Sequence, residues 1–164
     1  MADVKKIATR ESYGHALEEL GADHPEIVVL DADLKASTRT SYFAKKYPER
    51  FYDCGIAEGN MMTIAAGLAA GGMKPVFAVY SSFLQRAYDQ MIHDVALQNL
   101  PVMFAVDRAG LVGNDGETHQ GIFDLSYLSS IPNMVIMSPK HKWELADMVR
   151  FGISYEGSIA IRYP

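Results

Sequence analysis

The sequence has very little of several features that define whole classes of protein. It has one cysteine, Cys54, in 164 residues, so it cannot form an internal disulfide, and this usage fits a reducing cytosol. It has no apolar run near the roughly 20 residues that cross a membrane, and residues 1–6 have no apolar stretch behind their charges to act as a secretion signal. A net charge of −5 argues against binding nucleic acid through the overall field. These absences predict a cytoplasmic protein.

Several catalytic motifs are missing as well. There is no G-x-x-x-x-G-K-[ST] phosphate loop, no G-x-S-x-G serine elbow, no H-E-x-x-H and no pair of cysteines for zinc. The glycines of residues 67–72 follow a helical pattern, so they predict the end of a helix rather than a dinucleotide fingerprint. Asp31 and Asp33 could hold magnesium, although two aspartates so placed after a strand more often form a solvated turn.

What remains is the composition of one ordinary globular domain. The chain is 49% hydrophobic, 10% aromatic and 21% charged. A chain of this length buries about two-thirds of its unfolded surface, which is enough to fold without a metal or a disulfide. No internal repeat or long linker divides it, so residues 1–164 are expected to form a single domain.

Two patterns alternate along the chain. Short apolar and β-branched runs, typical of buried strands, occur at residues 27–30, 51–53, 75–80, 102–106, 134–137 and 159–163. Helical spacing of apolar residues occurs at 13–20, 57–68, 84–95 and 145–153, and the last helix is expected to begin with Ser138 as its N-cap and Pro139 in its first turn. Strands that alternate with helices predict an α/β fold, a doubly wound, mostly parallel sheet of about six strands with helices on both faces.

Such sheets bind ligands beyond the carboxyl ends of their strands. The segment that stands out there is residues 107–121 (DRAGLVGNDGETHQG), because connections in compact α/β domains are usually about two to six residues long and longer ones are commonly functional. The alternative is an ordinary solvated surface loop.

Glu58 is the most informative single residue. It opens an apolar helical segment, where a carboxylate gains only modestly from the helix dipole. It is either a first-turn glutamate near solvent or a carboxyl held in an apolar pocket, where it can share a proton with a ring nitrogen.

Three long strings carry a resemblance to a known family. They are FYDCGIAEGNMMTIAAGL (51–68), YSSFLQRAYDQMIHDVALQN (80–99) and DRAGLVGNDGETHQGIFDLSY (107–127). The sequence resembles the pyrimidine-binding domain of the transketolase class of thiamine diphosphate enzymes over nearly its whole length. Its second half is closest to 1-deoxy-D-xylulose-5-phosphate synthases, and its first half, with VLDADLKASTRT (29–40), is similar to the C-terminal subunit of two-gene transketolases.

The resemblance implies a site for the cofactor thiamine diphosphate. Glu58 matches the catalytic glutamate that hydrogen-bonds the aminopyrimidine ring, and Phe83 matches the aromatic residue that stacks on it. Ile56 is expected at the same ring. Since the cofactor supplies the nucleophile and electron sink, the protein's task is orientation and proton placement. A buried core phenylalanine is the alternative for Phe83.

The resemblance also implies substrate contacts, listed together here: Tyr80, Arg86, Arg108, Asp115 and His119. Arg108 matches an arginine that holds the phosphate of glyceraldehyde 3-phosphate, and a guanidinium suits that group. His119 matches a histidine near the reacting centre that can move protons at neutral pH. Arg86 could instead form a surface ion pair with Asp89, and His119 could be a solvated loop residue.

The chain also departs from the family pattern. Gly59 and Asn60 follow Glu58 where synthases usually have glutamine and histidine, and the G-D-G motif that holds magnesium and diphosphate is missing. The family continues beyond the position of Pro164. The resemblance therefore implies a transferase that needs a diphosphate-binding partner, which would hold the magnesium, and a homodimer or heteromer. Two functions stay open beside the decarboxylating synthase: transfer of a two-carbon ketol between sugar phosphates, and a non-catalytic scaffold or excised domain.

Overall fold

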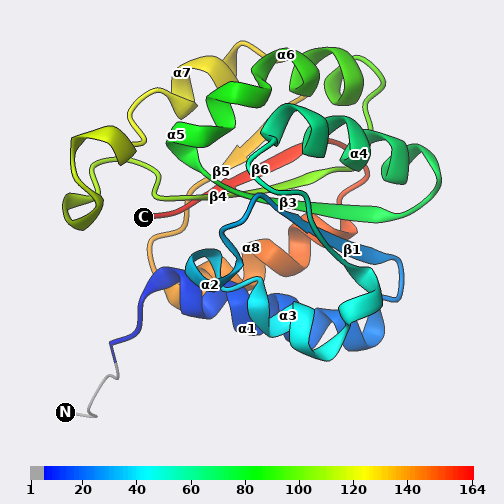
Figure 1. Cartoon of the computed structure of the whole chain (residues 1–164), viewed down its shortest axis with the longest axis horizontal. Coiled ribbons are helices and arrows are strands. Elements are labelled where there is room, and N and C mark those ends of the chain that lie inside the picture. Colours follow the sequence, from blue (N-terminus) through cyan, green and yellow to red (C-terminus); the bar gives the residue numbers. More distant parts are fainter. Residues whose placement is uncertain (1–5) are drawn as a thin grey trace.

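The computed structural model describes residues 6–164 and contains a six-stranded, entirely parallel sheet (Figure 1). The strands lie in the order β2-β1-β3-β4-β6-β5. Their bounds are Ile27–Asp31 for β1, Phe51–Asp53 for β2, Lys74–Tyr80 for β3, Met103–Asp107 for β4, Val135–Met137 for β5 and Ile159–Arg162 for β6. All six predicted strands are confirmed. Residues 1–5 lie outside the described residues. They are most of residues 1–6, where the sequence predicts no secretion signal.

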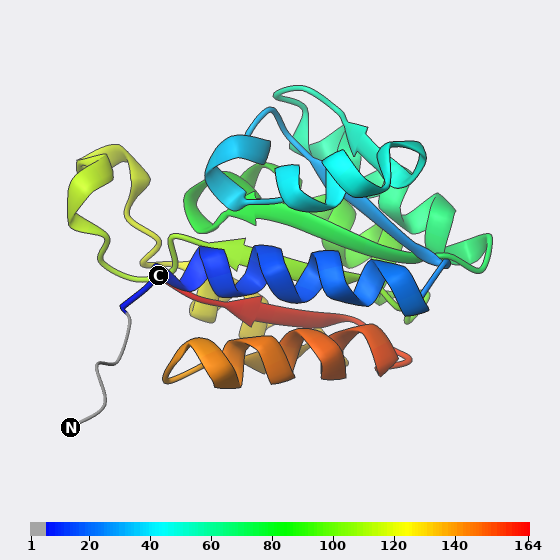
Figure 2. The ribbon, with the colours of Figure 1, turned by 90° about the horizontal axis from the view of Figure 1, so that it is seen from below.

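Helices cover both faces of the sheet, as the doubly wound fold requires. One face carries α1 (Thr9–Asp23), α3 (Ser41–Lys46) and α8 (Lys142–Ser154), and Figure 2 shows α1 and α8 side by side across it. The other carries α4 (Glu58–Ala70), α5 (Ser81–Leu84), α6 (Tyr88–Gln90) and α7 (Asp124–Ser129), while the short α2 (Lys35–Thr38) follows β1. No helix of the described part is long and apolar enough to cross a membrane.

Each face of the sheet has its own apolar core, because side chains alternate along a strand. On β3, Phe77 and Val79 pack under α4 and the helical turns after β3, whereas Val76 and Ala78 pack against α1 and α8. The chain leaves β1 toward the α3 face and leaves β3 toward the α5 face. The gap between the ends of these two neighbouring strands is therefore a switch point, where open α/β sheets bind ligands.

The helix predicted over residues 84–95 is wound in several ways. A 3-10 turn (Gln85–Ala87) follows α5, and a π-helical segment (Met91–Ala96) follows α6. The residues that this region buries are spaced three, four and four apart, and they are Leu84, Ala87, Met91 and Val95. These are the spacings of one face of a helix, so the predicted apolar face is confirmed although the winding is not uniform.

The predicted start of the last helix is wrong by three residues. The N-cap of α8 is His141, whose Nδ1 accepts the backbone N–H of Glu144, rather than Ser138. The Glu144 carboxylate in turn accepts the N–H of Lys140, so the two side chains cap the first turn together. The predicted stop of α4 at the glycines is confirmed, since the helix ends at Ala70 and Gly72 has a φ of +90°.

Candidate functional site

Three polar segments meet at the carboxyl edge of the sheet. They follow β1, β3 and β4, and the last residues of β3 and β4, Tyr80 and Asp107, are direct partners in the ladder. The turn that leads from β2 into α4 brings Glu58 to the same edge, beside the switch point. The sequence-predicted site residues therefore converge here from three separate parts of the chain.

Glu58 begins α4, and its side chain is only 3% exposed. It lines a cavity of about 130 Å³ with Ala32, Asp33, Leu34, Ile56, Phe83 and Arg86. Of the two alternatives, the carboxyl in a pocket is the one observed. Ile56 stands at the rim of this Glu58 cavity and is 73% exposed, an unusual position for a large apolar side chain.

Arg86 is the group that contacts the Glu58 carboxylate. It lies in the 3-10 turn after α5, and its Nη1 donates to Glu58 Oε1 at 2.6 Å. The guanidinium carbon also lies 4.6 Å from the centre of the Phe83 ring. The surface ion pair with Asp89 that the sequence left open is not the one formed; the partner of Arg86 is the buried Glu58.

Gly59 does not disturb this geometry. α4 runs through it without a break, and a Cβ at this position would meet the side chain of Gln90 at 3.4 Å, an ordinary contact distance. The departure from the family pattern therefore leaves the Glu58 carboxyl at the first turn of an intact helix.

An aromatic group adjoins the cavity. The rings of Tyr80 and Phe83 stack at 5.4 Å with an angle of 16° between their planes. The His119 ring meets both edge-on, at 5.2 Å from Phe83 and 6.1 Å from Tyr80. Its Nδ1 lies 2.8 Å from Oγ1 of Thr118, which leaves Nε2 as the ring nitrogen without that neighbour. His119 is thus a positioned residue rather than an isolated loop histidine.

Arg108, directly after β4, is held more firmly than any other cation of the site. Asp107 accepts both its backbone N–H and its Nη1 at 2.7 Å, and Asp115 accepts its Nε at 2.8 Å. Its guanidinium carbon lies 4.4 Å from the centre of the Tyr80 ring. The backbone φ of Arg108 is +58°, a left-handed conformation that costs a non-glycine residue energy and that clusters at functional sites.

The two carboxylates beside Arg108 have opposite pKa shifts. Burial raises the pKa of Asp107 to about 6, although the Arg108 charge and hydrogen bonds oppose that shift. The hydrogen bond from Arg108 lowers the pKa of Asp115, which lies on the exposed loop. Burial thus decides the shift of Asp107, and the ion pair decides that of Asp115.

The long loop is tied at its base by two glycines. The backbone groups of Gly110 and Gly121 bond each other in both directions, at 2.8 and 2.9 Å. Inside the loop, the Gln120 side chain bonds the backbone N–H and carbonyl of Val112. A Cβ on Gly121 would lie 2.6 Å from Ser81 Cβ, so only glycine fits there. These ties bring Asp115 and His119 back to the sheet edge, which makes the loop an organised one.

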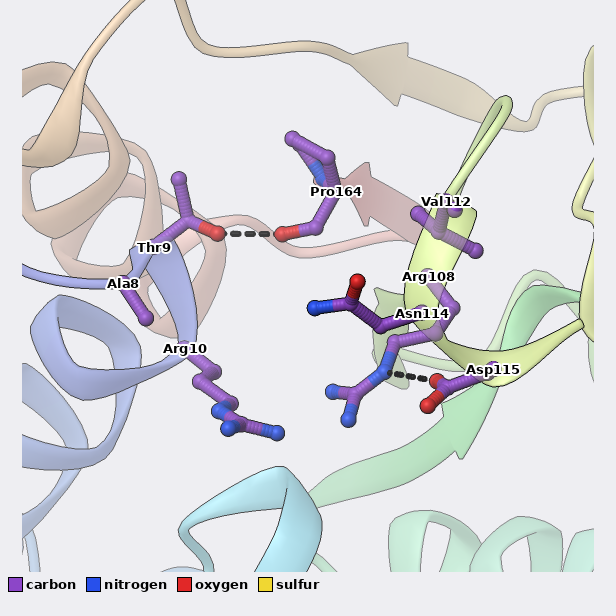
Figure 3. A pocket seen from close by; sticks show the side chains of 9 residues that line it. Ala8, Thr9, Arg10, Arg108, Val112, Asn114, Asp115 and Pro164 are labelled. Carbon is purple, nitrogen blue, oxygen red and sulfur yellow. Dashed lines mark hydrogen bonds and ion pairs between the residues drawn. The ribbon is translucent and has the colours of Figure 1, made fainter.

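Arg10 is a site residue that the sequence reasoning missed. It lies near the start of α1 and lines a pocket of about 380 Å³ with Arg108, Asp115, Asn114 and residues at both ends of the described chain (Figure 3). Figure 3 shows the two guanidinium groups, from α1 and from the β4 loop, facing the same space. No residue of the described chain bonds the buried Nε of Arg10. Arg10 lies outside the three strings that carry the resemblance, so the sequence gave no signal for it.

This arginine pocket, lined by Arg10, Arg108 and Asp115, has the chemistry of an anion site. Two guanidinium groups offer N–H donors and positive charge, and one N–H is buried without an acceptor. The aromatic group of Tyr80, Phe83 and His119 links it to the Glu58 cavity, since Tyr80 contacts Arg108 and Phe83 contacts Arg86. The edge therefore offers a ring-sized cavity at one end and an anion pocket at the other.

Asp31 has a structural role instead of a metal-binding or solvated one. Its buried carboxylate accepts hydrogen bonds from the Leu34 N–H and from the hydroxyls of Thr38 and Thr40, at 2.6 to 2.9 Å. Its oxygens are satisfied by the turn that follows β1. Within residues 6–164, no group of three or more His, Cys, Asp or Glu side chains is placed to hold a metal ion.

Comparison with known proteins finds one family over almost the whole chain. Residues 5–164 match the family "Transketolase, pyrimidine binding domain". The 1-deoxy-D-xylulose-5-phosphate synthase of Dictyoglomus thermophilum is 59% identical over 98% of this chain, and that of Carboxydothermus hydrogenoformans is 54% identical over 99%. In each case the matched part is 26% of the relative, so the chain spans about a quarter of the length of these proteins.

Solved structures give the same result for the fold. A structure titled as a split-gene transketolase, an inactive β4 tetramer, superposes with a TM-score of 0.85 and 42% identity, over 96% of this chain and 51% of that one. The transketolase of Campylobacter jejuni superposes with a TM-score of 0.87 and 26% identity, over 96% of this chain and 26% of that one.

Proposed function

The chain belongs to the family of transketolase pyrimidine-binding domains, and on this premise we propose that it is the pyrimidine-binding half of a thiamine diphosphate-dependent transferase. The reaction that the relatives support best is that of 1-deoxy-D-xylulose-5-phosphate synthase, in which pyruvate loses carbon dioxide and its remaining two carbons join glyceraldehyde 3-phosphate. The observation that carries the proposal is the buried carboxylate of Glu58 beside Phe83, at the switch point of the sheet.

The residues of the Glu58 cavity fit the aminopyrimidine ring. Phe83 offers an apolar ring face, and Glu58 offers a buried carboxylate that accepts hydrogen bonds from N–H donors. The cavity of about 130 Å³ is well below the roughly 300–1,000 Å³ of complete small-molecule sites. This size supports a site for one end of the cofactor, with the diphosphate and its magnesium held by another domain.

When bound, thiamine diphosphate supplies the carbanion nucleophile and the electron sink of the reaction. Glu58 would hold the ring through a hydrogen bond to a ring nitrogen, and its burial would strengthen that bond because little water competes. Phe83, fixed by Tyr80 behind it, sets the plane of the ring. Nε2 of His119 is the nitrogen available to give or take a proton at a substrate oxygen.

The arginine pocket is proposed to hold the phosphate of the sugar substrate. Arg108 is fixed by two carboxylates, and Arg10 has a buried donor without an acceptor, so little reorganisation is needed when an anion enters. Tyr80 and Asp115 border Arg108 and complete the substrate side of the site. The phosphate at this end and the ring at the other would orient the reacting carbon between them.

The site is completed by a partner domain or subunit, in a homodimer or a heteromer. Large apolar side chains stand exposed along the same edge: Ile56, Leu111, Ile122 and Phe123. Such side chains mark protein interfaces when they gather around a functional edge. The split-gene transketolase structure is titled an inactive β4 tetramer, which supports the need for a diphosphate-binding partner. We place this pair in the cytoplasm.

A second candidate is the transketolase reaction, the transfer of a two-carbon ketol between sugar phosphates. The observation that favours it is the 42% identity to the split-gene transketolase, whose chain is matched over half its length. The two candidates use the same ring cavity and differ in the donor that they consume.

Calorimetry tests the proposal directly. Thiamine diphosphate with magnesium is titrated into the chain alone and into the chain mixed with a diphosphate-binding subunit. We expect binding only in the mixture and loss of activity in Glu58→Ala, with Glu156→Ala, an 83% exposed glutamate, as the matched control. Strong magnesium-dependent binding by the chain alone would refute the half-site proposal, and consumption of pyruvate or of a ketose phosphate by the mixture separates the two reactions.

A further inference from the structure

Arg86 makes the two contacts that the proposed function assigns to the cofactor ring. Its guanidinium lies over the face of Phe83, 4.6 Å from the ring centre, and it donates a 2.6 Å hydrogen bond to Glu58. A guanidinium, like an aminopyrimidine, is planar and carries N–H donors along its edge. The same aromatic face and the same carboxylate oxygen are therefore occupied by a side chain of the protein itself.

The buried carboxylate explains why such a group is needed. Glu58 is 3% exposed, and among residues 6–164 Arg86 is the only side chain that bonds its carboxylate. A buried carboxylate without a partner is costly, so the chain gains stability when a cation covers it. Arg86 is well suited to leave again, because its side chain is 52% exposed and extends to the mouth of the cavity.

From this geometry we infer that Arg86 stands in for the cofactor ring in the free chain and is displaced when the ring binds. The inference rests on the proposed function, since it takes the Glu58 cavity as the ring site. A ring that stacks on the face of Phe83 over which the guanidinium lies requires that the guanidinium move away from that face. Arg86 is thus a tethered competitor for the cofactor, and cofactor binding moves its charge outward to the substrate side of the site.

Binding affinity tests the competition. Thiamine diphosphate with magnesium is titrated calorimetrically into the chain mixed with its diphosphate-binding subunit, for wild type, Arg86→Gln and Arg150→Gln. Arg150 is a matched control because it is half exposed and forms its ion pairs with Glu19 of α1 and Asp147 of α8, at the opposite face of the sheet. Removing the competitor should tighten binding by about tenfold, the change that corresponds to about 1.4 kcal/mol. Arg150→Gln should bind like wild type.

The outcomes are distinct. Equal or weaker binding by Arg86→Gln, with wild type binding measurably, overturns the displacement and leaves the proposed function intact. No binding by any of the three mixtures overturns the proposed function and this inference with it. Tighter binding by Arg86→Gln alone supports both.

A second measurement uses the unaltered side chain and so does not depend on how the variant folds. The Nη–H resonances of Arg86 are followed by ¹⁵N NMR in the wild-type mixture, because Nη1 donates the hydrogen bond to Glu58. Glu58→Gln is used to identify the paired state. We expect a slowly exchanging signal that shifts and exchanges faster with solvent as thiamine diphosphate is added. A signal that keeps its position and exchange rate while the cofactor binds would overturn the inference.

Discussion

Asp107 should make the folded chain less stable as the pH rises, and Asp107→Asn should remove that dependence. The residue ends β4 with its carboxylate fully buried and bonded to Arg108. Burial raises its pKa to about 6 in the folded chain, against 3.8 for the unperturbed group. Between these two values the folded chain binds more protons than the unfolded chain, so the free energy of unfolding falls with increasing pH.

The expected size follows from the two pKa values. The whole shift corresponds to about 3 kcal/mol, at roughly 1.36 kcal/mol per pKa unit. At about pH 4.5 about 1 kcal/mol of this stabilisation has already been lost, so linkage predicts a further loss of about 2 kcal/mol between about pH 4.5 and about pH 7.5. Asparagine has no proton to lose in this range. The free energy of unfolding of Asp107→Asn, minus that of wild type, should therefore rise by about 2 kcal/mol over this interval.

Urea denaturation at a series of pH values measures this difference, and the other titrating groups cancel in it. Asp115→Asn is the contrasting variant, because the hydrogen bond from Arg108 lowers the pKa of Asp115. Its contribution to stability is present above the unfolded pKa and is lost as the pH falls, so its profile relative to wild type should slope the other way. Parallel profiles for wild type and Asp107→Asn would refute the reasoning.

Three further changes have expected outcomes. Gly121→Ala forces a Cβ against the carbonyl of Arg108 and should cost about 1–3 kcal/mol of stability, measured by urea denaturation, with Gly113→Ala as the control in open space; equal costs would contradict this. Arg162→Ala removes the partner of the buried Asp124, which it contacts with two nitrogens at 2.6 and 3.2 Å, and should cost about 3–5 kcal/mol in the same assay. Ile56→Ser should leave the stability of the free chain within about 0.5 kcal/mol of wild type and weaken its association with the diphosphate-binding subunit in ultracentrifugation; unchanged association would place Ile56 outside the interface.

The sheet could be predicted from the sequence because its signal is local. Both faces of the central strands β1, β3 and β4 are buried, so these strands appear as apolar runs, and all six strands lie where the sequence predicts them. The start of α8 could not be predicted in the same way. Ser138 and Pro139 are a common start for a helix, but the capping by His141 and Glu144 depends on side chains that fold back over the first turn. Ser138 and His141 are both possible N-caps, and the side-chain contacts that select His141 cannot be read from the spacing of residue types.

The site residues also divide into those that the local sequence predicts and those that only the packing of the fold brings together. The strings around Glu58, Phe83 and His119 carried their resemblance in consecutive residues, and the structure brings these three side chains to one edge. Their catalytic roles stay predictions. Arg10 is far from them in sequence and reaches the site because α1 packs beside the end of β6, where Thr9 bonds the carbonyl of Pro164. Proximity of this kind depends on the packing of helices against the sheet.

The two glycines that close the base of the loop, Gly110 and Gly121, also let the tip of the loop open without opening the sheet. Residues 111–120 are joined to the sheet through the bonds between Gly110 and Gly121, so breaking contacts at the tip does not require any ladder bond of β4 to open. Local opening of this kind costs only a small part of the global free energy of unfolding. The tip that carries Asp115 and His119 therefore opens and closes many times during the life of one folded chain, while the ladder bonds of β4 behind it stay formed.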